Sequence, residues 1–198
     1  MQGFDNIQPG DVKYVDKNED GVIDEYDVSV IGGDKPLSFF GIDMGFEFKG
    51  IEFSMLWQGV YNRDIYLGNR EFTEGFFQIN QHYGQAYRHL LNRWTPENSS
   101  TATFPRLSVG GNNYNYGNYW GSSLWKKSGN FIRLKNLYIA YNIPESISRN
   151  LIDGFRVKFF IGAQNLLTFS AIDLVDPEVS FTNYPLQKTV NFGVNINF

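Results

Sequence analysis

Hydrophobic and polar residues alternate in five segments of the chain, and the first two of these lie next to each other. From 39 to 48, the even positions are Phe40, Ile42, Met44, Phe46 and Phe48. From 51 to 61, the apolar side is Ile51, Phe53, Met55, Trp57, Gly59 and Tyr61. A period of two indicates a β-strand with two unlike faces. The dipeptide Lys49-Gly50 predicts a tight turn, so we expect a β-hairpin here.

The second half of the chain contains three more segments of this kind. They cover residues 131–142, 155–169 and 187–198, and the last alternates apolar residues with Asn and Gly. Strands in globular proteins usually have about 5–6 residues, whereas membrane-spanning strands have about 9–11. These lengths favour membrane strands. A soluble sheet with one buried face would alternate in the same way and remains the alternative.

The connections between the strands differ in length. The turns at 49–50 and 143–154 are short, whereas the connections at 62–129 and 170–185 are longer. A transmembrane barrel has short periplasmic turns and long extracellular loops, which matches this order. Within the longest connection we expect a short helix over 83–93.

Composition narrows the classes of protein. Aromatic residues make up 17% of the 198 residues, although mean hydropathy is −0.34 and charged residues are 19%. Carbohydrate-binding β-proteins and transmembrane β-barrels both use aromatic residues in this way. The absence of cysteine excludes thiolate chemistry in this chain, and the net charge of −4 argues against a nucleic-acid partner.

Residues 16–27 fit the twelve-residue calcium loop of the EF-hand, which takes ligands at positions 1, 3, 5, 7, 9 and 12. These positions hold Asp16, Asn18, Asp20, the Val22 carbonyl, Asp24 and Asp27. Gly21 stands sixth, where the turn needs a positive φ. We expect Ca²⁺ here, with Mg²⁺ as the alternative because Asp27 is shorter than the usual glutamate. A solvated acidic turn held by its own hydrogen bonds is the other interpretation.

Exposed aromatic rings are a second candidate site, since they can stack on sugars or pack against other loops or a lid protein. These are Tyr114, Tyr116, Tyr119 and Trp120. Packing is the favoured interpretation. His82 and His89 have no third ligand, so we assign them no metal.

Several charged or amide residues lie near predicted strand ends. Asp173, Asp176 and Glu178 could be read as the paired carboxylates of a glycosidase, but they share one loop, so catalysis is the least favoured reading. We expect Arg133 and Lys135 to line the lumen of a barrel or to lie near its extracellular rim. The alternative is that they lie at a solvated strand end. Gln164-Asn165 is expected to have a structural role.

Seven motifs occur in an order that carries a family resemblance. They are PGDVKYVDKNEDGVIDEYD at 9–27, RWTPEN at 93–98, FPRL at 104–107, NFIRLKNLYIAYNIP at 130–144, FFIGAQNLLTFS at 159–170, DPE at 176–178 and TVNFGVNINF at 189–198. Together they resemble the C-terminal part of SusC/RagA-type TonB-linked outer-membrane transporters of the Bacteroidota. The resemblance implies a barrel of about 22 strands with an internal plug.

The same resemblance implies partners and a location. They are a SusD-like lipoprotein lid, the TonB–ExbB–ExbD system, outer-membrane lipid, and a glycan or peptide substrate. The location is the bacterial outer membrane. No plug, TonB box or secretion signal is recognisable, and five strands would leave two sheet edges open. We therefore expect a fragment of a longer protein.

The sequence thus predicts an all-β, antiparallel partial barrel without enzymatic activity. Residues 1–38 would form an extracellular loop region, and residues 39–198 the C-terminal barrel strands and loops. The alternative function is a soluble, secreted carbohydrate-binding β-module with a calcium-stapled loop. One set of apolar residues discriminates between the two, by forming either an outward band or a closed core: Phe40, Met44, Phe53, Trp57, Phe159 and Phe192.

Overall fold

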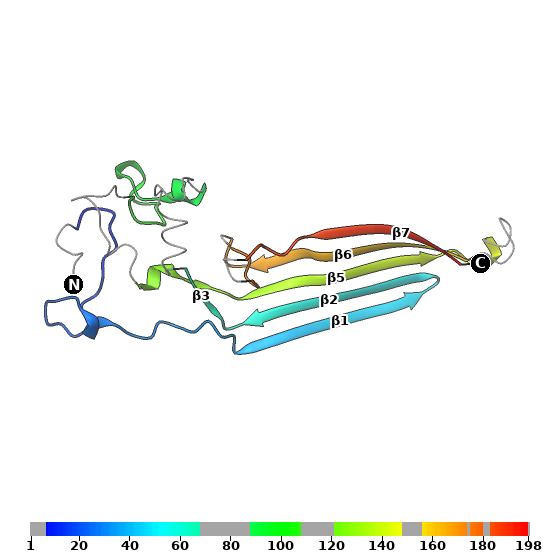
Figure 1. Cartoon of the computed structure of the whole chain (residues 1–198), viewed down its shortest axis with the longest axis horizontal. Helices are drawn as coiled ribbons and strands as arrows, with labels where there is room; N and C mark the ends of the chain where they lie inside the picture. The colour runs from blue at the N-terminus through cyan, green and yellow to red at the C-terminus, as the bar shows by residue number, and fades with distance from the viewer. Residues whose placement is uncertain are drawn as a thin grey trace. The chain divides into compact units, whose positions relative to one another are not determined.

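A computed structural model describes residues 7–67, 88–107, 121–147, 156–173, 175–179 and 183–197. Its main element is an antiparallel sheet of five strands in the order β1-β2-β5-β6-β7 (Figure 1). The strands are β1 (Ser38–Phe48), β2 (Ile51–Tyr61), β5 (Phe131–Asn142), β6 (Arg156–Ser170) and β7 (Thr189–Asn197). These are the five strands that the alternation predicts, and their ends differ from the predicted ones by at most two residues.

The other elements are short. Strands β3 (Asp64–Tyr66) and β4 (Lys126–Ser128) form a two-stranded sheet. The 3-10 helices are η1 (Glu25–Asp27), η3 (Arg88–Asn92), η4 (Pro96–Asn98) and η6 (Ser123–Trp125). The helix expected over 83–93 is described only from residue 88, where it is the 3-10 helix η3. In the part of the chain that the structure describes, no helix is long and apolar enough to cross a membrane.

The turn between β1 and β2 explains the register of the first hairpin. Lys49 and Gly50 both have a positive φ, 48° and 85°, as a two-residue type I′ turn requires. A side chain at Gly50 would place its Cβ 2.7 Å from the carbonyl oxygen of Asn142, so only glycine fits there. The turn sets Phe48 opposite Ile51, and most of the large apolar residues of the two strands then fall on one face.

The same register continues across the sheet and produces two unlike faces. One row of paired residues runs Phe46, Phe53, Ile139, Ile161 and Phe192. The next row, on the opposite face, runs Gly45, Ser54, Tyr138, Gly162 and Asn191. Neighbouring residues on a strand point to opposite sides, so these rows define an apolar face and a polar face of one sheet.

Two bulges interrupt the ladder without exchanging the faces. Against β2, Lys135 is the extra residue on β5, because the neighbours Leu56 and Trp57 pair with Asn136 and Leu134. Against β6, Lys135 stands opposite two residues, because Leu134 pairs with Leu167 and Asn136 with Gln164. On β6 the extra residues include Asn165, whose φ of 52° lies in the left-handed region that asparagine tolerates. The Asn165 side chain donates to the carbonyl of Gln187 at 3.1 Å. Asn165 therefore has a structural role at the bulge.

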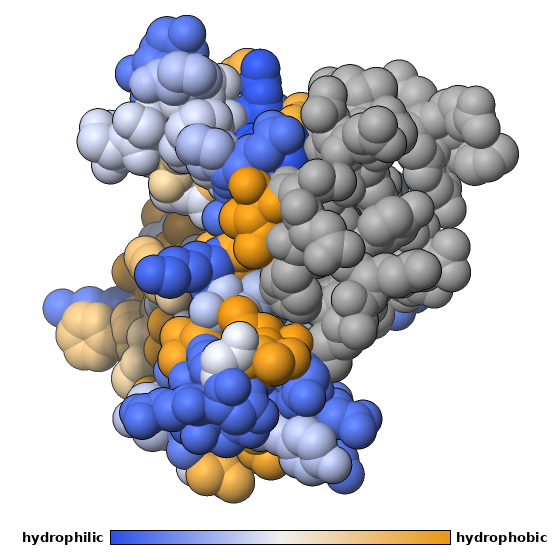
Figure 2. All heavy atoms as spheres, turned by 90° about the vertical axis from the view of Figure 1, so that its left-hand side faces the viewer, coloured by the Kyte–Doolittle hydropathy of each residue, from blue (hydrophilic) through white to orange (hydrophobic). Residues whose placement is uncertain are grey.

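The chain divides into two compact units. The first comprises Met1–Gly33 and Ile65–Lys127, and the second comprises Asp34–Asp64 and Ser128–Phe198, which includes the main sheet. The sequence analysis divided the chain at residue 38 into an extracellular loop region and a barrel region. The two compact units are defined by contacts within the chain, so they do not test that division. On the side shown in Figure 2, hydrophilic patches alternate with hydrophobic ones on the described surface.

The first unit has its own small core. Leu67 and Trp125 are almost completely buried, and the Leu67 N–H donates to the Trp125 carbonyl at 2.9 Å. The ring of Phe104 lies 6.2 Å from that of Trp125. Burial of these large side chains stabilises a unit that contains little regular secondary structure.

Candidate functional site

The apolar face of the main sheet is exposed along all five strands. Phe192 is 76% exposed, Phe46 56% and Phe159 48%. Other large apolar residues on this face are exposed as well: Phe40, Ile42, Met44, Phe48, Ile51, Ile139, Tyr141, Ile161, Leu167, Phe169, Val190, Val194 and Ile196. An apolar patch that continues over five strands is rare on a soluble monomer and marks a surface that meets a partner or a membrane.

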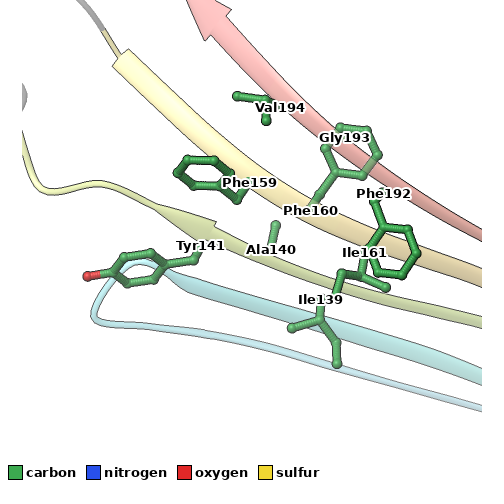
Figure 3. A pocket seen from close by; sticks show the side chains of 9 residues that line it. All are labelled: Ile139, Ala140, Tyr141, Phe159, Phe160, Ile161, Phe192, Gly193 and Val194. Atoms are coloured by element: carbon green, nitrogen blue, oxygen red, sulfur yellow. The ribbon is translucent and has the colours of Figure 1, made fainter.

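A groove across β5, β6 and β7 shows the chemistry of this region (Figure 3). It is lined by Ile139, Ala140, Tyr141, Phe159, Phe160, Ile161, Phe192, Gly193 and Val194. Apart from the Tyr141 hydroxyl, these side chains offer no polar group. Sites for small ligands combine apolar walls with a few placed polar groups. The groove is therefore typical of a surface that meets hydrocarbon.

The residues that discriminate between the two sequence interpretations all lie on the apolar face. The register of the four strand pairs places Phe40, Met44, Phe53, Trp57, Phe159 and Phe192 on the same side. Rings on this side contact their neighbours within the sheet, as the Phe46–Phe53 stack at 5.1 Å shows. Within the described residues they form a band and not a closed core, which favours the barrel.

The polar face carries ion pairs that join neighbouring strands. Near the short-turn end of the sheet, Lys158 on β6 pairs with Glu52 on β2 at 2.7 Å. Asn142 on β5, between them, donates to the same carboxylate at 2.6 Å. Further along, the rings of Tyr138 and Phe160 stack at 6.0 Å, and the Phe160 ring covers Gly193. The polar face is thus ordered by side-chain contacts between strands.

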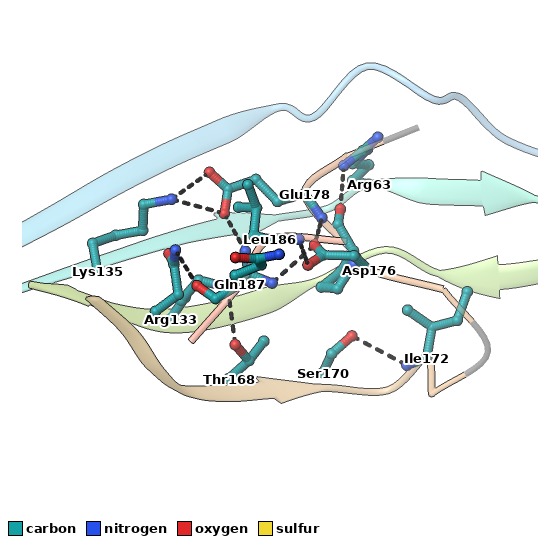
Figure 4. A network of polar contacts seen from close by, with 12 residues as sticks. Arg63, Arg133, Lys135, Thr168, Ser170, Ile172, Asp176, Glu178, Leu186 and Gln187 are labelled. Carbon is teal, nitrogen blue, oxygen red and sulfur yellow. Dashed lines mark hydrogen bonds and ion pairs between the residues drawn. The ribbon is translucent and has the colours of Figure 1, made fainter. Parts of the chain in front are cut away.

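A larger ion-paired network lies at the other end of this face, where the long connections begin (Figure 4). Arg133 on β5 is 3% exposed. Its guanidinium donates to Asp176 at 2.8 Å, to Glu178 at 2.7 Å and to the Thr168 hydroxyl at 2.9 Å. Lys135 adds a contact to Glu178 at 2.8 Å. Arg133 and Lys135, whose place the sequence left open, are therefore both part of this network.

The carboxylates of the network are not arranged for acid–base catalysis. Burial alone would raise the pKa of Asp176, but the N–H groups of Glu178 and Leu186 and the Arg133 guanidinium together hold it below its usual range. A catalytic acid in a glycosidase needs a raised pKa. Asp173, the third carboxylate of that reading, is exposed. The contacts assign Asp176 and Glu178 to ion pairing.

The acidic loop folds back on itself through side-chain to backbone bonds. The Asp16 carboxylate accepts the N–H groups of Glu19 and Gly21, both at 2.7 Å. Asp20 accepts the N–H of Val22 at 2.8 Å, and the φ of Gly21 is 83°. The positive φ at the sixth position is the one that the EF-hand template requires.

Asp27 closes the loop at its far end. Its carboxylate accepts the N–H of Lys17 at 2.6 Å and that of Asp24 at 2.8 Å. These bonds, first that from Asp24, lower the pKa of Asp27. In the described part of the chain, no three acidic or histidine side chains form a metal-binding group. The donor set consists of oxygen atoms that suit Ca²⁺, but metal binding would require the side chains to turn toward one point.

Some residues to which the sequence analysis gave a role lie outside the part of the chain that the structure describes. They are Tyr114, Tyr116, Tyr119 and Trp120, together with His82, the side chain of His89, and Phe198. Their roles stay predictions.

The sequence analysis missed a buried ion pair in the first unit. Asp11, whose side chain is fully buried, contacts the Arg106 guanidinium at 2.6 Å, and the Arg106 N–H donates to the Gly10 carbonyl at 2.8 Å. The ring of Trp94 packs on Gly10. Three motifs that carry the family resemblance, at 9–27, 93–98 and 104–107, thus meet in space. The occurrence of these motifs together in the sequence was the only sign that they could be in contact.

Known proteins resemble the chain along almost its whole length. It is 30% identical over 211 aligned residues to "TonB-dependent receptor P26" and 25% identical over 207 to "TonB-dependent receptor P3", both of Formosa agariphila. Each alignment covers 96% of the chain. The chain is related to the TonB-dependent receptors. It spans about a fifth of these relatives, 20% and 19% of their lengths. No protein-family model matches it.

Solved structures agree on the fold. The RagAB peptide transporter superposes with a TM-score of 0.60 at 24% identity, over 85% of this chain and 18% of that chain. The RagAB peptide importer in its open-open state gives the same TM-score at 23% identity. At these identities the likeness shows the fold, and it confirms the antiparallel all-β architecture. TonB-dependent receptors are outer-membrane proteins, so the predicted location is confirmed as well.

Proposed function

We propose that this chain forms part of the wall of an outer-membrane transporter that imports large nutrients. The apolar face contacts lipid, and the polar face lines the interior. The observation that carries the proposal is the sheet itself, in which exposed apolar residues continue over all five strands on one face and polar residues and ion pairs gather on the other. Membrane barrels alternate in this way, with lipid-facing and lumen-facing residues on each strand.

The relatives support a class of substrate and a set of partners. Resemblance to SusC/RagA-type transporters and to the RagAB peptide transporter supports a peptide or a glycan as the substrate. The same relatives support a SusD-like lipoprotein as the lid and TonB–ExbB–ExbD as the energy source. On this topology the short turn at 49–50 is periplasmic and the long connections are extracellular.

We also propose that the loop at 16–27 binds Ca²⁺ on the extracellular side. The support is the template spacing, the positive φ of Gly21, and the backbone N–H groups that donate to Asp16 and Asp27 and close the loop. The ligands would be Asp16, Asn18, Asp20, the Val22 carbonyl, Asp24 and Asp27. The cation would offset the repulsion between the carboxylates of this short segment.

Extraction of the tagged full-length protein from outer membranes tests the transport proposal. We expect the protein to stay in the membrane fraction in plain buffer, to need detergent for extraction, and to co-purify with a lipoprotein. Analysis of the bound material by mass spectrometry would separate peptide from glycan. A protein that is monomeric in buffer without detergent would instead support the soluble carbohydrate-binding module.

A further inference from the structure

A short segment between β6 and β7 lies across the polar face of the sheet. We call residues 175–179 the strap. Its two carboxylates, on Asp176 and Glu178, point to β5, where Arg133 and Lys135 bind them (Figure 4). Pro177 between them is buried. The strap therefore rests on the sheet through charged contacts and not through apolar packing alone.

The strap is also held from the end of β2. Arg63, just beyond β2, donates to the Pro177 carbonyl at 2.7 Å. The same guanidinium donates to the carbonyl of Asp34 at 3.1 Å, which fixes its direction. Contacts from β5 and from residue 63 thus reach the strap from two places that are far apart in the sequence.

Asp176 connects the strap to the segment just before the last strand. Its carboxylate accepts the N–H of Glu178 at 2.9 Å and the N–H of Leu186 at 3.2 Å. The Asp176 side chain is 7% exposed and that of Arg133 is 3% exposed. Removal of either partner would leave a buried charge without compensation, so the intact pair and its additional hydrogen bonds hold the strap against β5.

We propose that the Arg133 network latches the strap over the polar face, so that the strap is a fixed inward ledge of the passage at its extracellular end. The ledge narrows the opening, and Arg133 is its positioning residue. This inference rests on the proposed function for the direction "inward". The latch itself concerns only contacts within the second unit and is tested separately from transport.

The latch can be tested by distance measurements between two spin labels in the full-length protein in detergent. One label replaces Val179, at the end of the strap, and the other replaces Asn195 on β7. This chain contains no cysteine, so any other cysteines of the full-length protein are replaced first. We expect a narrow distance distribution in the parent protein and one at least twice as wide in Arg133→Met.

Two further variants keep the test sharp. Arg156→Met removes another arginine of the sheet, one whose ion pair with Glu145 is exposed, and should leave the distribution unchanged. Asp176→Asn weakens the latch from the strap side and leaves β5 intact, so it should widen the distribution even if Arg133→Met fails to fold. A narrow distribution in folded Arg133→Met or Asp176→Asn would overturn the latch. A soluble protein with a wide distribution in these variants would overturn the transporter and keep the latch.

Discussion

The ring of Trp94 packs directly on Gly10, and no side chain fits between them. A Cβ built on Gly10 would lie 2.5 Å from two ring atoms of Trp94, and the φ of Gly10 is 91°. The two residues are far apart in the sequence, so this contact joins two distant segments of the first unit. The buried Asp11–Arg106 pair lies beside it.

Gly10→Ala should open this contact. We expect a cost of about 1–2 kcal/mol from the left-handed backbone and about 1–3 kcal/mol from overpacking. The Arg106 N–H, which is bound to the Gly10 carbonyl, should exchange with deuterium at least tenfold faster. Gly33→Ala is the control, because nothing lies within 4 Å of its Cβ. Equal exchange in both variants would contradict the packing.

Asn165 should be required for its conformation as well as for its hydrogen bond. Asn165→Ala loses the bond to Gln187, about 1 kcal/mol, and strains the left-handed backbone by about 1–2 kcal/mol. Asn165→Gly loses the bond but relieves the strain. The urea concentration at the unfolding midpoint of the full-length protein should therefore be highest in the parent, lower in Asn165→Gly and lowest in Asn165→Ala. A lower urea midpoint in Asn165→Gly than in Asn165→Ala would rule out the role of the positive φ.

Acid should release the strap. The pKa of Asp176 is lowered in the folded protein, so the stabilisation is complete above the usual aspartate range and is lost as pH falls through the lowered value. The groups facing Asp176 are Arg133 and the N–H groups of Glu178 and Leu186. The spin-label distribution should stay narrow at pH 7 and 5 and widen only when the pH falls below the usual aspartate range.

Asp173→Asn provides the comparison for this pH effect, since Asp173 is an exposed carboxylate of the same loop. It should leave the transition in place, whereas Asp176→Asn should give a wide distribution at every pH. A transition that survives in Asp176→Asn would assign the effect to another group.

Calcium should bind with a calorimetric signal that depends on particular carboxylates. Asp16→Ala and Asp20→Ala should each abolish most of the heat, because they remove template ligands. Glu25→Ala removes one negative charge from the same loop at a position without a ligand, so binding should persist with at most a small loss. Equal loss in all three variants would indicate charge alone, and unchanged heat in all three would contradict the site.

The strands and their faces could be predicted because they depend on short-range patterns. The alternation of residues 39–48 and 51–61 fixes which side chains share a face, and Lys49-Gly50 fixes the turn. The strap and the Asp11–Arg106 pair could not be predicted in this way. Their partners are 43–45 and 95 residues apart, and an isolated arginine on a strand does not show which carboxylate it meets.

The acidic loop lies between these cases. The spacing of Asp16, Gly21 and Asp27 predicted a closed turn, because their hydrogen bonds are local. Binding of a cation depends on the difference between two free energies, the relief of carboxylate repulsion and the cost of removing water from the ion. The sequence pattern does not determine that difference.

The accessibility of spin labels along β7 tests the lipid-facing wall most directly. Single labels at 192 and 194, on the apolar face, and at 191 and 195, on the polar face, are measured in the full-length protein in lipid vesicles. Collisions with oxygen should dominate at 192 and 194, and collisions with a water-soluble nickel chelate at 191 and 195. High nickel accessibility at all four positions would contradict a membrane wall.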